Sequence, residues 1–375
     1  MVSISFAILS YLYIDDYIER TIVMKIGLLS MQRVVNYGSF WQAYCLKKMI
    51  CDQGNCTLEF IDIIPGDVET RTVYKRAFSF SKIKRIPYYL FQNKKKKIFF
   101  DYQRTVLGCT EDKNYQSNYD SIIIGSDEVF NFVQESPWGF STQLYGDIDN
   151  QNVSTYAACF GNTTYDAIQR TNREETIHSA LNNIQHLSVR DENSAEIIEK
   201  ITHKRPEIHL DPVLVGEFPD GLPNIKEKNY ILVYSYDFRL SDPDIIKQVR
   251  SFAREKRLSI ISVGFYQDWV NKNVLPNPLE LLSYFKNADY VITDTFHGTI
   301  FSTRMHRQFV TVIRNTNKEK LGDLLSRIGL KEREYDNGKS IKELLEKQID
   351  YSSFEEYRMR EIDRSKSYLK KCIER

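Results

Sequence analysis

The sequence predicts an α/β fold with parallel sheets, and two observations carry the prediction. From Met24 onward, short apolar runs of strand length alternate with longer runs whose apolar residues recur at helical spacing. The strand-like runs also end in Gly, Asp, Ser or Asn, the residues expected where a strand turns into a loop. With 375 residues, 42% of them hydrophobic, the chain can bury one large core or two ordinary ones.

The first half of the chain shows this alternation from residue 24 to the end of an apolar run near residue 191. Met24 begins the sequence MKIGLLS, a typical first strand of such a unit, and a helical pattern follows at 39–50. The expected strands of this half are 25–30, 56–64, 119–126, 152–160 and 186–191.

Residues 1–23 precede the first expected strand. Residues 1–14 are mostly apolar but lack the basic start of a signal peptide, and they are too short to span a bilayer. We expect 1–23 to be an extension or the product of a mis-assigned start codon; a small amphipathic anchor is the other interpretation.

The pattern changes at residues 206–214, and a second unit follows. Residues 216–229 carry two prolines, two glycines and a cluster of charges, which is typical of an inter-domain linker. The sequence thus predicts Rossmann-like domains at 24–220 and 221–330, followed by C-terminal helices at 331–375. In the second domain, strands are expected at 229–237, 258–265 and 290–295, and helices at 242–256 and 278–288.

Composition excludes several classes of function. The formal charge of +1 gives no overall attraction for nucleic acid. The six cysteines form no CxxC pair, which favours a reduced, cytoplasmic compartment over a disulfide-bonded secreted one. No histidine pair has the spacing of a metal site, so no metal is expected.

Ligands of open α/β sheets bind beyond the carboxyl ends of the strands, so the junctions after strands are candidate sites. After the first strand, Asn36 and Gly38 precede a helix; a glycine there lets backbone N–H groups approach an anion at the helix start. A loop that only joins strand to helix explains these residues equally well.

A second junction lies at 121–131. Ser126 and Asp127 follow a buried strand, and Asn131 closes the polar cluster. The pair Ser126 and Asp127 could cap the next helix, or Asp127 could hold a sugar hydroxyl or position a histidine.

The third junction is the stretch YVITDTFHGTIFST at 290–303. Asp294 and the pair His297 and Gly298 lie between a buried strand and a helix start. A lone histidine is commonly structural, but imidazole is well suited to proton transfer near neutral pH, and we expect Gly298 to leave room beside the ring.

Five segments together resemble the polysaccharide pyruvyl transferase family, and they occur in the same order. The similarity runs from about Met24 to about residue 315. The segments are NYGSFWQAY, DSIIIGSDEVFN, SVRDENS, HLDPVL and ITDTFHGTIFS. The resemblance implies two Rossmann-like domains facing a cleft, as in GT-B glycosyltransferases. It also implies transfer of a pyruvyl group from phosphoenolpyruvate to a sugar, with no further cofactor.

The resemblance also implies roles for individual residues. His297 aligns with the family's His-Gly motif and is the expected acid/base. Arg190 is the expected partner of the donor carboxylate, unless it forms only a surface ion pair with Asp191 or Glu192. Gly298 and Thr299 are expected to bind the donor phosphate at a helix start, with Asn36 and Gly38. Residues for the acceptor sugar are expected to be Ser126, Asp127, Asn131 and Asp294.

Two departures from the family pattern stand out. Many members have Gln and Trp where this chain has Glu128 and Phe130. Some members carry a basic residue at the position of Phe296, which leaves the donor anion one fewer obvious partner here.

Residues 71–104 are rich in basic and aromatic residues and contain one acid, Asp101. This mixture is typical of a segment on an anionic membrane surface, which would bring the enzyme to a lipid-linked acceptor. A solvated helix face is the alternative, and no nucleic-acid-binding motif accompanies the segment.

Three classes of function remain from the sequence. A pyruvyltransferase on a surface polysaccharide or its lipid-linked precursor is the first. The others are a GT-B glycosyltransferase that uses a nucleotide sugar, and a non-catalytic sugar-binding protein. The acceptor sugar, the ketal stereochemistry and the oligomeric state do not follow from the sequence.

Overall fold

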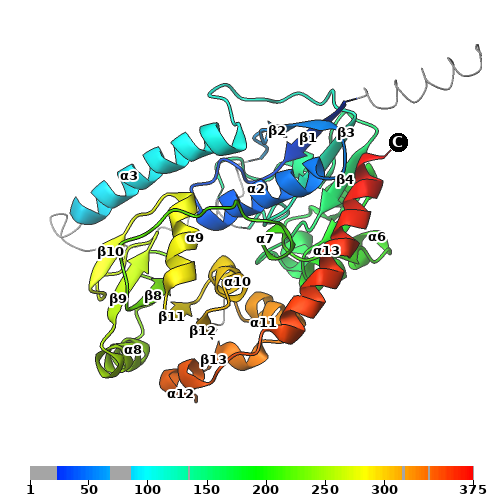
Figure 1. The fold of residues 1–375 in the computed structure, drawn as a ribbon. Coiled ribbons are helices and arrows are strands. Elements are labelled where there is room, and N and C mark those ends of the chain that lie inside the picture. The colour runs from blue at the N-terminus through cyan, green and yellow to red at the C-terminus, as the bar shows by residue number, and fades with distance from the viewer. Residues whose placement is uncertain (1–22, 68–85, 134–135, 315–316, 337, 375) are drawn as a thin grey trace, which may run out of the picture.

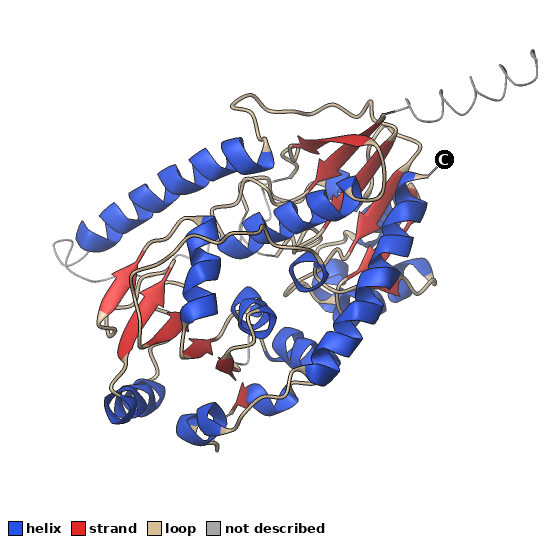
Figure 2. Ribbon diagram, viewed as in Figure 1, coloured by secondary structure: helices blue, strands red, loops and turns tan. Residues whose placement is uncertain are grey.

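A computed structural model of the protein describes residues 23–67, 86–133, 136–314, 317–336 and 338–374. It contains two large parallel sheets with helices packed on both, and a small two-stranded sheet (Figures 1 and 2). The predicted extension at 1–23 falls almost wholly outside the described residues.

The first sheet has five parallel strands in the order β2-β1-β3-β4-β5. Its central strands are buried on both faces, as parallel sheets covered by helices require. The strands are β1 (Met24–Leu29), β2 (Cys56–Ile61), β3 (Ser121–Gly125), β4 (Val153–Tyr156) and β5 (Ile184–His186).

The helices of this first unit begin at polar caps that the sequence supplies. Asn36 accepts a hydrogen bond from the N–H of Gly38, and Asp191 accepts one from the N–H of Ser194, so helices start directly after these residues. The helices are α2 (Tyr37–Cys51), α3 (Ile86–Tyr102), α4 (Tyr165–Arg170), α5 (Glu174–Leu181), α6 (Glu192–Thr202) and α7 (Pro212–Val215).

The second sheet has six parallel strands in the order β10-β9-β8-β11-β12-β13. Its strands are β8 (Tyr230–Tyr234), β9 (Ser259–Val263), β10 (Lys272–Val274), β11 (Tyr290–Thr293), β12 (Gln308–Val312) and β13 (Glu334–Tyr335). Its helices are α8 (Pro243–Lys256), α9 (Pro278–Asn287), α10 (Phe296–Arg304), α11 (Lys318–Arg327) and α12 (Ile341–Glu346).

The predicted linker at 216–229 forms neither helix nor strand and joins α7 to β8. Residues 331–375, expected to be helical, also supply the edge strand β13. The last helix, α13 (Ser352–Ile373), runs back from the second unit and packs on β3 and β4 of the first sheet (Figure 1). The protein thus has the predicted fold class, two α/β units in a GT-B-like arrangement.

One sequence-predicted strand is divided in the structure. The expected strand at 186–191 is split between the end of β5 and β6 (Ser188–Val189). Strand β6 pairs with β7 (Glu207–Ile208) in a two-stranded sheet and also forms a bridge to Ala158, just after β4. Arg190 and Asp211, which follow β6 and β7, meet at 3.0 Å.

Candidate active site

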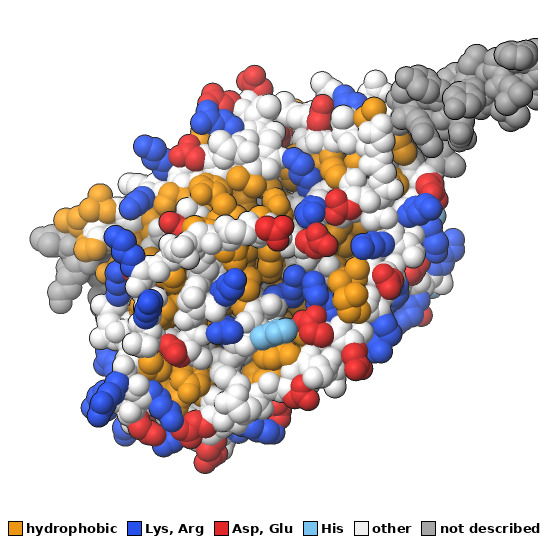
Figure 3. All heavy atoms as spheres, viewed as in Figure 1, with side chains coloured by type: hydrophobic (Ala, Val, Ile, Leu, Met, Phe, Trp, Pro, Cys, Tyr) orange, Lys and Arg blue, Asp and Glu red, His pale blue; other side chains and the backbone are white. Residues whose placement is uncertain are grey.

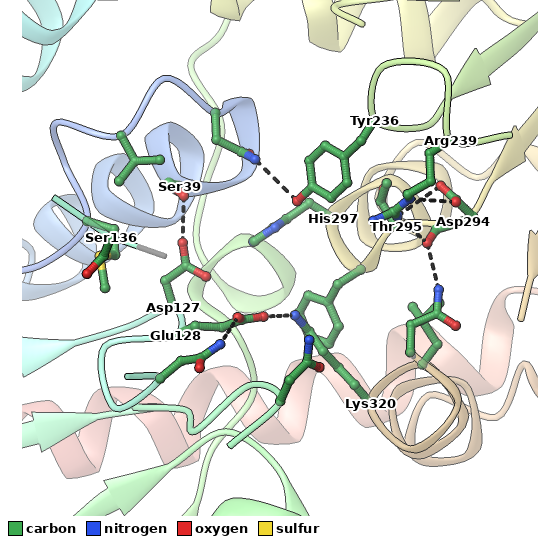
Figure 4. A pocket seen from close by; sticks show the side chains of 18 of the residues that line it. Ser39, Asp127, Glu128, Ser136, Tyr236, Arg239, Asp294, Thr295, His297 and Lys320 are labelled. Carbon is green, nitrogen blue, oxygen red and sulfur yellow. Dashed lines mark hydrogen bonds and ion pairs between the residues drawn. The ribbon is translucent and has the colours of Figure 1, made fainter. Parts of the chain in front are cut away.

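A pocket of about 340 Å³ lies where the carboxyl ends of the two sheets face each other. Its wall from the first unit comes from the loops after β1 and β3 and from the first turn of α2. It includes Asn36, Ser39, Asp127, Glu128 and Asn131. Its wall from the second unit follows β8, β11 and β12 and includes Arg239, Asp294, His297, Arg314, Asn317 and Lys320. Figure 4 shows these two sets of side chains converging on the same space.

His297 projects from the first turn of α10 toward the first unit (Figure 4). The helix starts there because Thr295 accepts a hydrogen bond from the N–H of Gly298. The imidazole Nε2 is buried and lies 3.5 Å from Oδ2 of Asp211, and its other nitrogen, Nδ1, lies against Gly38. The predicted acid/base residue is therefore at the pocket wall between the two units.

Gly38 makes the room for this ring. A Cβ atom at Gly38 would lie 2.1 Å from Nδ1 of His297, which is closer than any side chain tolerates. The N–H of Gly38 donates to Asn36 at 2.7 Å, so it does not face the pocket as an anion donor. The sequence prediction that Gly298 leaves this room was wrong: a Cβ at Gly298 would instead meet Thr293, Thr295 and Tyr234.

Two arginines in the pocket wall both lie against the carboxylate of Asp294. Arg239 donates from Nε and Nη2 to the Asp294 carboxylate at 2.8 and 3.1 Å, and Nε of Arg314 lies 3.3 Å from the same group. Burial, together with Arg239, lowers the pKa of Arg314. Asp294 is fully buried, so its oxygens serve the arginines rather than an open sugar site, as Figure 4 shows.

Lys320 and Glu128 form an ion pair across the pocket, one from each unit (Figure 4). Burial alone would raise the pKa of Glu128, but Lys320 and Arg190 outweigh it and lower that pKa to about 2. The Lys320 ammonium also lies 4.9 Å from the centre of the Phe296 ring. Lys320 thus places a cation beside the position where some family members carry a basic residue.

The polar residues after β3 form the opposite wall. Asp127 accepts a hydrogen bond from the hydroxyl of Ser39 at 2.6 Å, and Asn131 donates to Glu128 at 2.8 Å. Ser126 is fully buried, and its hydroxyl accepts from the N–H of Asp127. Of the predicted acceptor residues in this loop, Asp127 and Asn131 line the pocket and Ser126 does not.

Besides Gly38, three further predicted donor-binding residues lie outside the pocket wall. Arg190 is 2% exposed, and its guanidinium donates to Asp211 at 3.0 Å and to Cys159 Sγ at 3.2 Å. The N–H of Gly298 is taken by Thr295, and the hydroxyl of Thr299 faces Thr295 O and Thr311. Burial of these groups leaves no open face for a donor, so this geometry does not support the predicted contacts.

The sequence analysis missed the cations of the pocket. Arg239 and Arg314 follow the ends of β8 and β12, so the strand-end rule that singled out His297 also applied to them. Lys320 and Ser39 lie on helices rather than at strand ends, and only the fold brings them to the pocket. Phe296, noted in the sequence as a departure, is a pocket residue in the structure.

Two parallel α/β units around one polar pocket define a GT-B-like protein. Within that class, the chain belongs to the polysaccharide pyruvyl transferase family, whose family model matches residues 36–317. Membership makes the protein a transferase of the pyruvyltransferase class that acts in polysaccharide biosynthesis.

Structural comparison gives distant similarities over nearly the whole chain. An S. aureus MnaA–UDP co-structure is 12% identical, covers 92% of this chain and 91% of its own, and has a TM-score of 0.43. The glycotransferase of kitacinnamycin is 8% identical, with coverages of 94% and 98% and a TM-score of 0.49. A Methanocaldococcus jannaschii UDP-GlcNAc 2-epimerase is 13% identical, with coverages of 89% and 98% and a TM-score of 0.45. With identities this low and TM-scores below 0.5, the ligands of these proteins say nothing about the ligands of this chain. A search among curated proteins finds no match.

Proposed function

We propose that the protein transfers a pyruvyl group from phosphoenolpyruvate to two hydroxyls of a sugar, forming a cyclic ketal on a surface polysaccharide or its lipid-linked precursor. One hydroxyl oxygen attacks C2 of the enol while C3 takes up a proton and becomes a methyl group. The C2–O bond to phosphate breaks, and the second hydroxyl closes the ketal. Of the two hydroxyl protons, one is balanced by the new C–H bond and the other leaves with phosphate.

The observation that carries this proposal is the unequal charge of the two pocket walls. The second unit contributes Arg239, Arg314 and Lys320, which suit a donor that bears both a carboxylate and a phosphate. The first unit contributes Asp127, Glu128 and Asn131, whose oxygens and amide suit sugar hydroxyls. His297 lies between the two walls, where a proton must move between acceptor and donor.

In this proposal, donor binding changes the ion pair that crosses the pocket. A donor anion beside Lys320 competes with Glu128 for the ammonium. Because Lys320 is a main cause of the low pKa of Glu128, its loss as a partner makes Glu128 more basic and frees it for an acceptor hydroxyl. This role would explain why the chain has Glu at position 128, where many family members have Gln.

We also propose that the reaction takes place in the cytoplasm, where phosphoenolpyruvate is made, with the enzyme at the inner face of the membrane. None of the helices in the described ranges is both long enough and apolar enough to cross a bilayer. The described part of the predicted membrane segment is residues 86–104, which begin with α3; residues 71–85 lie outside the described residues.

The test is acceptor-dependent release of phosphate from phosphoenolpyruvate, with galactose-, mannose- and N-acetylmannosamine-containing acceptors. His297→Ala is expected to lower the rate by about 10²-fold or more, the contribution typical of a general acid/base. His306→Ala is the matched control, because His306 pairs with Glu355 and does not line this pocket.

Full activity of His297→Ala would contradict the assigned role of the histidine. If the wild-type protein bound a nucleotide sugar and not phosphoenolpyruvate, the glycosyltransferase alternative would replace this proposal.

A further inference from the structure

Asp211 is a buried carboxylate that lies behind His297, on the side away from the pocket opening. It is 1% exposed, and its Oδ2 atom lies 3.5 Å from His297 Nε2. This nitrogen has no other hydrogen-bond partner among the described residues and no contact with solvent. Catalytic hydrogen bonds are often long in free enzymes and shorten when substrate binds.

The Asp211 carboxylate is held by two further groups. Oδ1 accepts a hydrogen bond from the N–H of Val213 at 2.9 Å, and Oδ2 accepts one from Nη1 of Arg190 at 3.0 Å. Burial alone would raise the pKa of Asp211, but His297 and Arg190 lower it to about 2, so the carboxylate is ionised at neutral pH.

The helices that carry the two residues are also tied together. Arg304, in the last turn of α10, donates from Nη1 to the carbonyl oxygens of Val213, Leu214 and Gly216 at 2.6, 3.0 and 2.8 Å. Asp211 caps the start of α7, and His297 lies in the first turn of α10. The side chain of Arg304 therefore holds α7, which follows Asp211, against α10, which carries His297.

Helix capping alone does not explain this arrangement. A cap requires one carboxylate oxygen, which Oδ1 provides. Asp191 and Asp242 cap α6 and α8 in the same way, and within the described part of the chain neither forms a hydrogen bond or ion pair with a histidine. The second oxygen of Asp211 is thus available for a separate role toward His297.

We infer that Asp211 is the positioning residue of the active site: it holds the His297 proton on Nε2 and leaves Nδ1 to exchange protons with substrate. Arg190 keeps Asp211 charged and oriented, and its guanidinium packs 4.2 Å from the Phe296 ring, next to His297. The charged carboxylate also stabilises the imidazolium that forms when Nδ1 takes a proton. This inference rests on the proposed acid/base role of His297 and gives Arg190 a function different from donor binding.

The first test uses the free protein and needs no substrate. In ¹⁵N-labelled protein, long-range ¹H–¹⁵N spectra report which nitrogen of each histidine carries the proton, and His297→Gln identifies the signal of His297. We expect neutral His297 to carry its proton on Nε2. A wild-type ring protonated on Nδ1 would overturn the inference without any variant at Asp211.

The second test compares Asp211→Asn with Asp191→Asn. Asparagine caps helices as well as aspartate does, so both variants keep their caps and lose one buried negative charge. Asp211→Asn is expected to shift the His297 tautomer toward Nδ1–H, whereas Asp191→Asn leaves the spectrum of His297 unchanged. Equal spectra of His297 in the wild type and Asp211→Asn, or equal shifts in both variants, would overturn the inference.

Measurements of pyruvyl transfer distinguish failure of this inference from failure of the proposed function. If pyruvyl transfer is observed, Asp211→Asn should lower kcat by about 10²-fold or more with little change in the donor KM. Loss of donor binding with unchanged kcat would contradict positioning. If the wild type transfers no pyruvyl group but the His297 tautomer follows Asp211, the proposed function fails while the Asp211–His297 pair stands.

Discussion

The imidazole of His297 occupies the space that a side chain at position 38 would need. Gly38 belongs to α2 of the first unit and His297 to α10 of the second, so this contact joins the two halves of the active site. Because the ring also faces Asp211, it is held on two sides. The position of the His297 imidazole therefore depends on Gly38, a residue with no side chain that could take part in the reaction.

Gly38→Ala should displace the His297 ring. The added methyl group overlaps ring atoms, and such overpacking typically costs about 1–3 kcal/mol in the free energy of unfolding. A misplacement of about 1 Å at a catalytic group can cost about 10²-fold in rate. Urea unfolding and phosphate release measure the two effects.

Gly54→Ala is the control for this variant, because nothing lies within 4 Å of a Cβ at Gly54. It should leave both stability and rate nearly unchanged. If Gly38→Ala behaved like the control, the observed contact between Gly38 and His297 would not be important for activity.

At the residue scale, the sequence predicted the location of some pocket residues, while their roles remain predictions. His297, Asp127 and Asn131 follow strands that end at the pocket, and the strand-end rule predicted them. Arg190 also follows a strand, but its side chain is buried against Asp211 and Cys159 instead of lining the pocket. Asp211 was visible in a family motif, but its contact with His297 requires the folded chain.

At the element scale, the strands were predictable because a buried parallel strand is a short apolar run between loop residues. The residues at which strands end were less predictable, since β4 ends at Tyr156 while the apolar pattern continues to residue 160.

Helix α3 differs from the other long helices, because only Lys95 and Phe99 of its 17 residues are buried. Lys95 lies 3.9 Å from the Phe265 ring of the second unit, which anchors the helix across both units.

The remaining surface of α3 is both apolar and basic. Ile86, Tyr89 and Leu90 are 55%, 53% and 65% exposed near its start, where Figure 3 shows hydrophobic side chains at the left end of the molecule. Three exposed lysines follow at 94, 96 and 97. This combination favours binding at the surface of an anionic membrane.

We therefore expect the full-length protein to float with vesicles that contain phosphatidylserine, and not with phosphatidylcholine alone. At about 1 kcal/mol for each basic residue, replacing Lys94, Lys96 and Lys97 by Gln should weaken binding by about 10²-fold. The matched control replaces Lys366, Lys370 and Lys371 of α13, which are also exposed. Equal loss in both triple variants, or equal flotation with neutral vesicles, would refute a membrane face on α3.

At the scale of the whole molecule, the two units share a continuous hydrophobic core. Trp41 of α2 packs in the same cluster as Phe285 of α9, and its indole N–H donates to the carbonyl of Pro278 at 3.2 Å. Tyr37 makes a similar bond to Pro276 at 2.7 Å. The sequence predicted two α/β units, but the contacts between them join residues far apart in the chain, such as Trp41 and Pro278.

The ion pair of Glu128 and Lys320 is a contact between the units that a change of pH can break. Glu128 has a pKa of about 2 in the folded protein, against 4.5 for a glutamate in an unfolded chain. Below the folded value the carboxyl is neutral in both states. Above 4.5 it is charged in both states, and the ion pair stabilises only the folded one. Its contribution to stability is therefore fully present above pH 4.5 and is lost as the pH falls toward 2.

Glu128→Gln should consequently be less stable than the wild type at pH 7, and the difference should shrink by pH 3. Urea unfolding at both pH values measures it. In a Lys320→Met background the Glu128→Gln change should lose most of its effect at pH 7, giving a coupling energy of about 0.5–3 kcal/mol, as for residues in direct contact. A stability difference that is the same at pH 7 and pH 3 would mean that Glu128 and Lys320 do not hold the units together. A donor anion would then have no ion pair between the units to open.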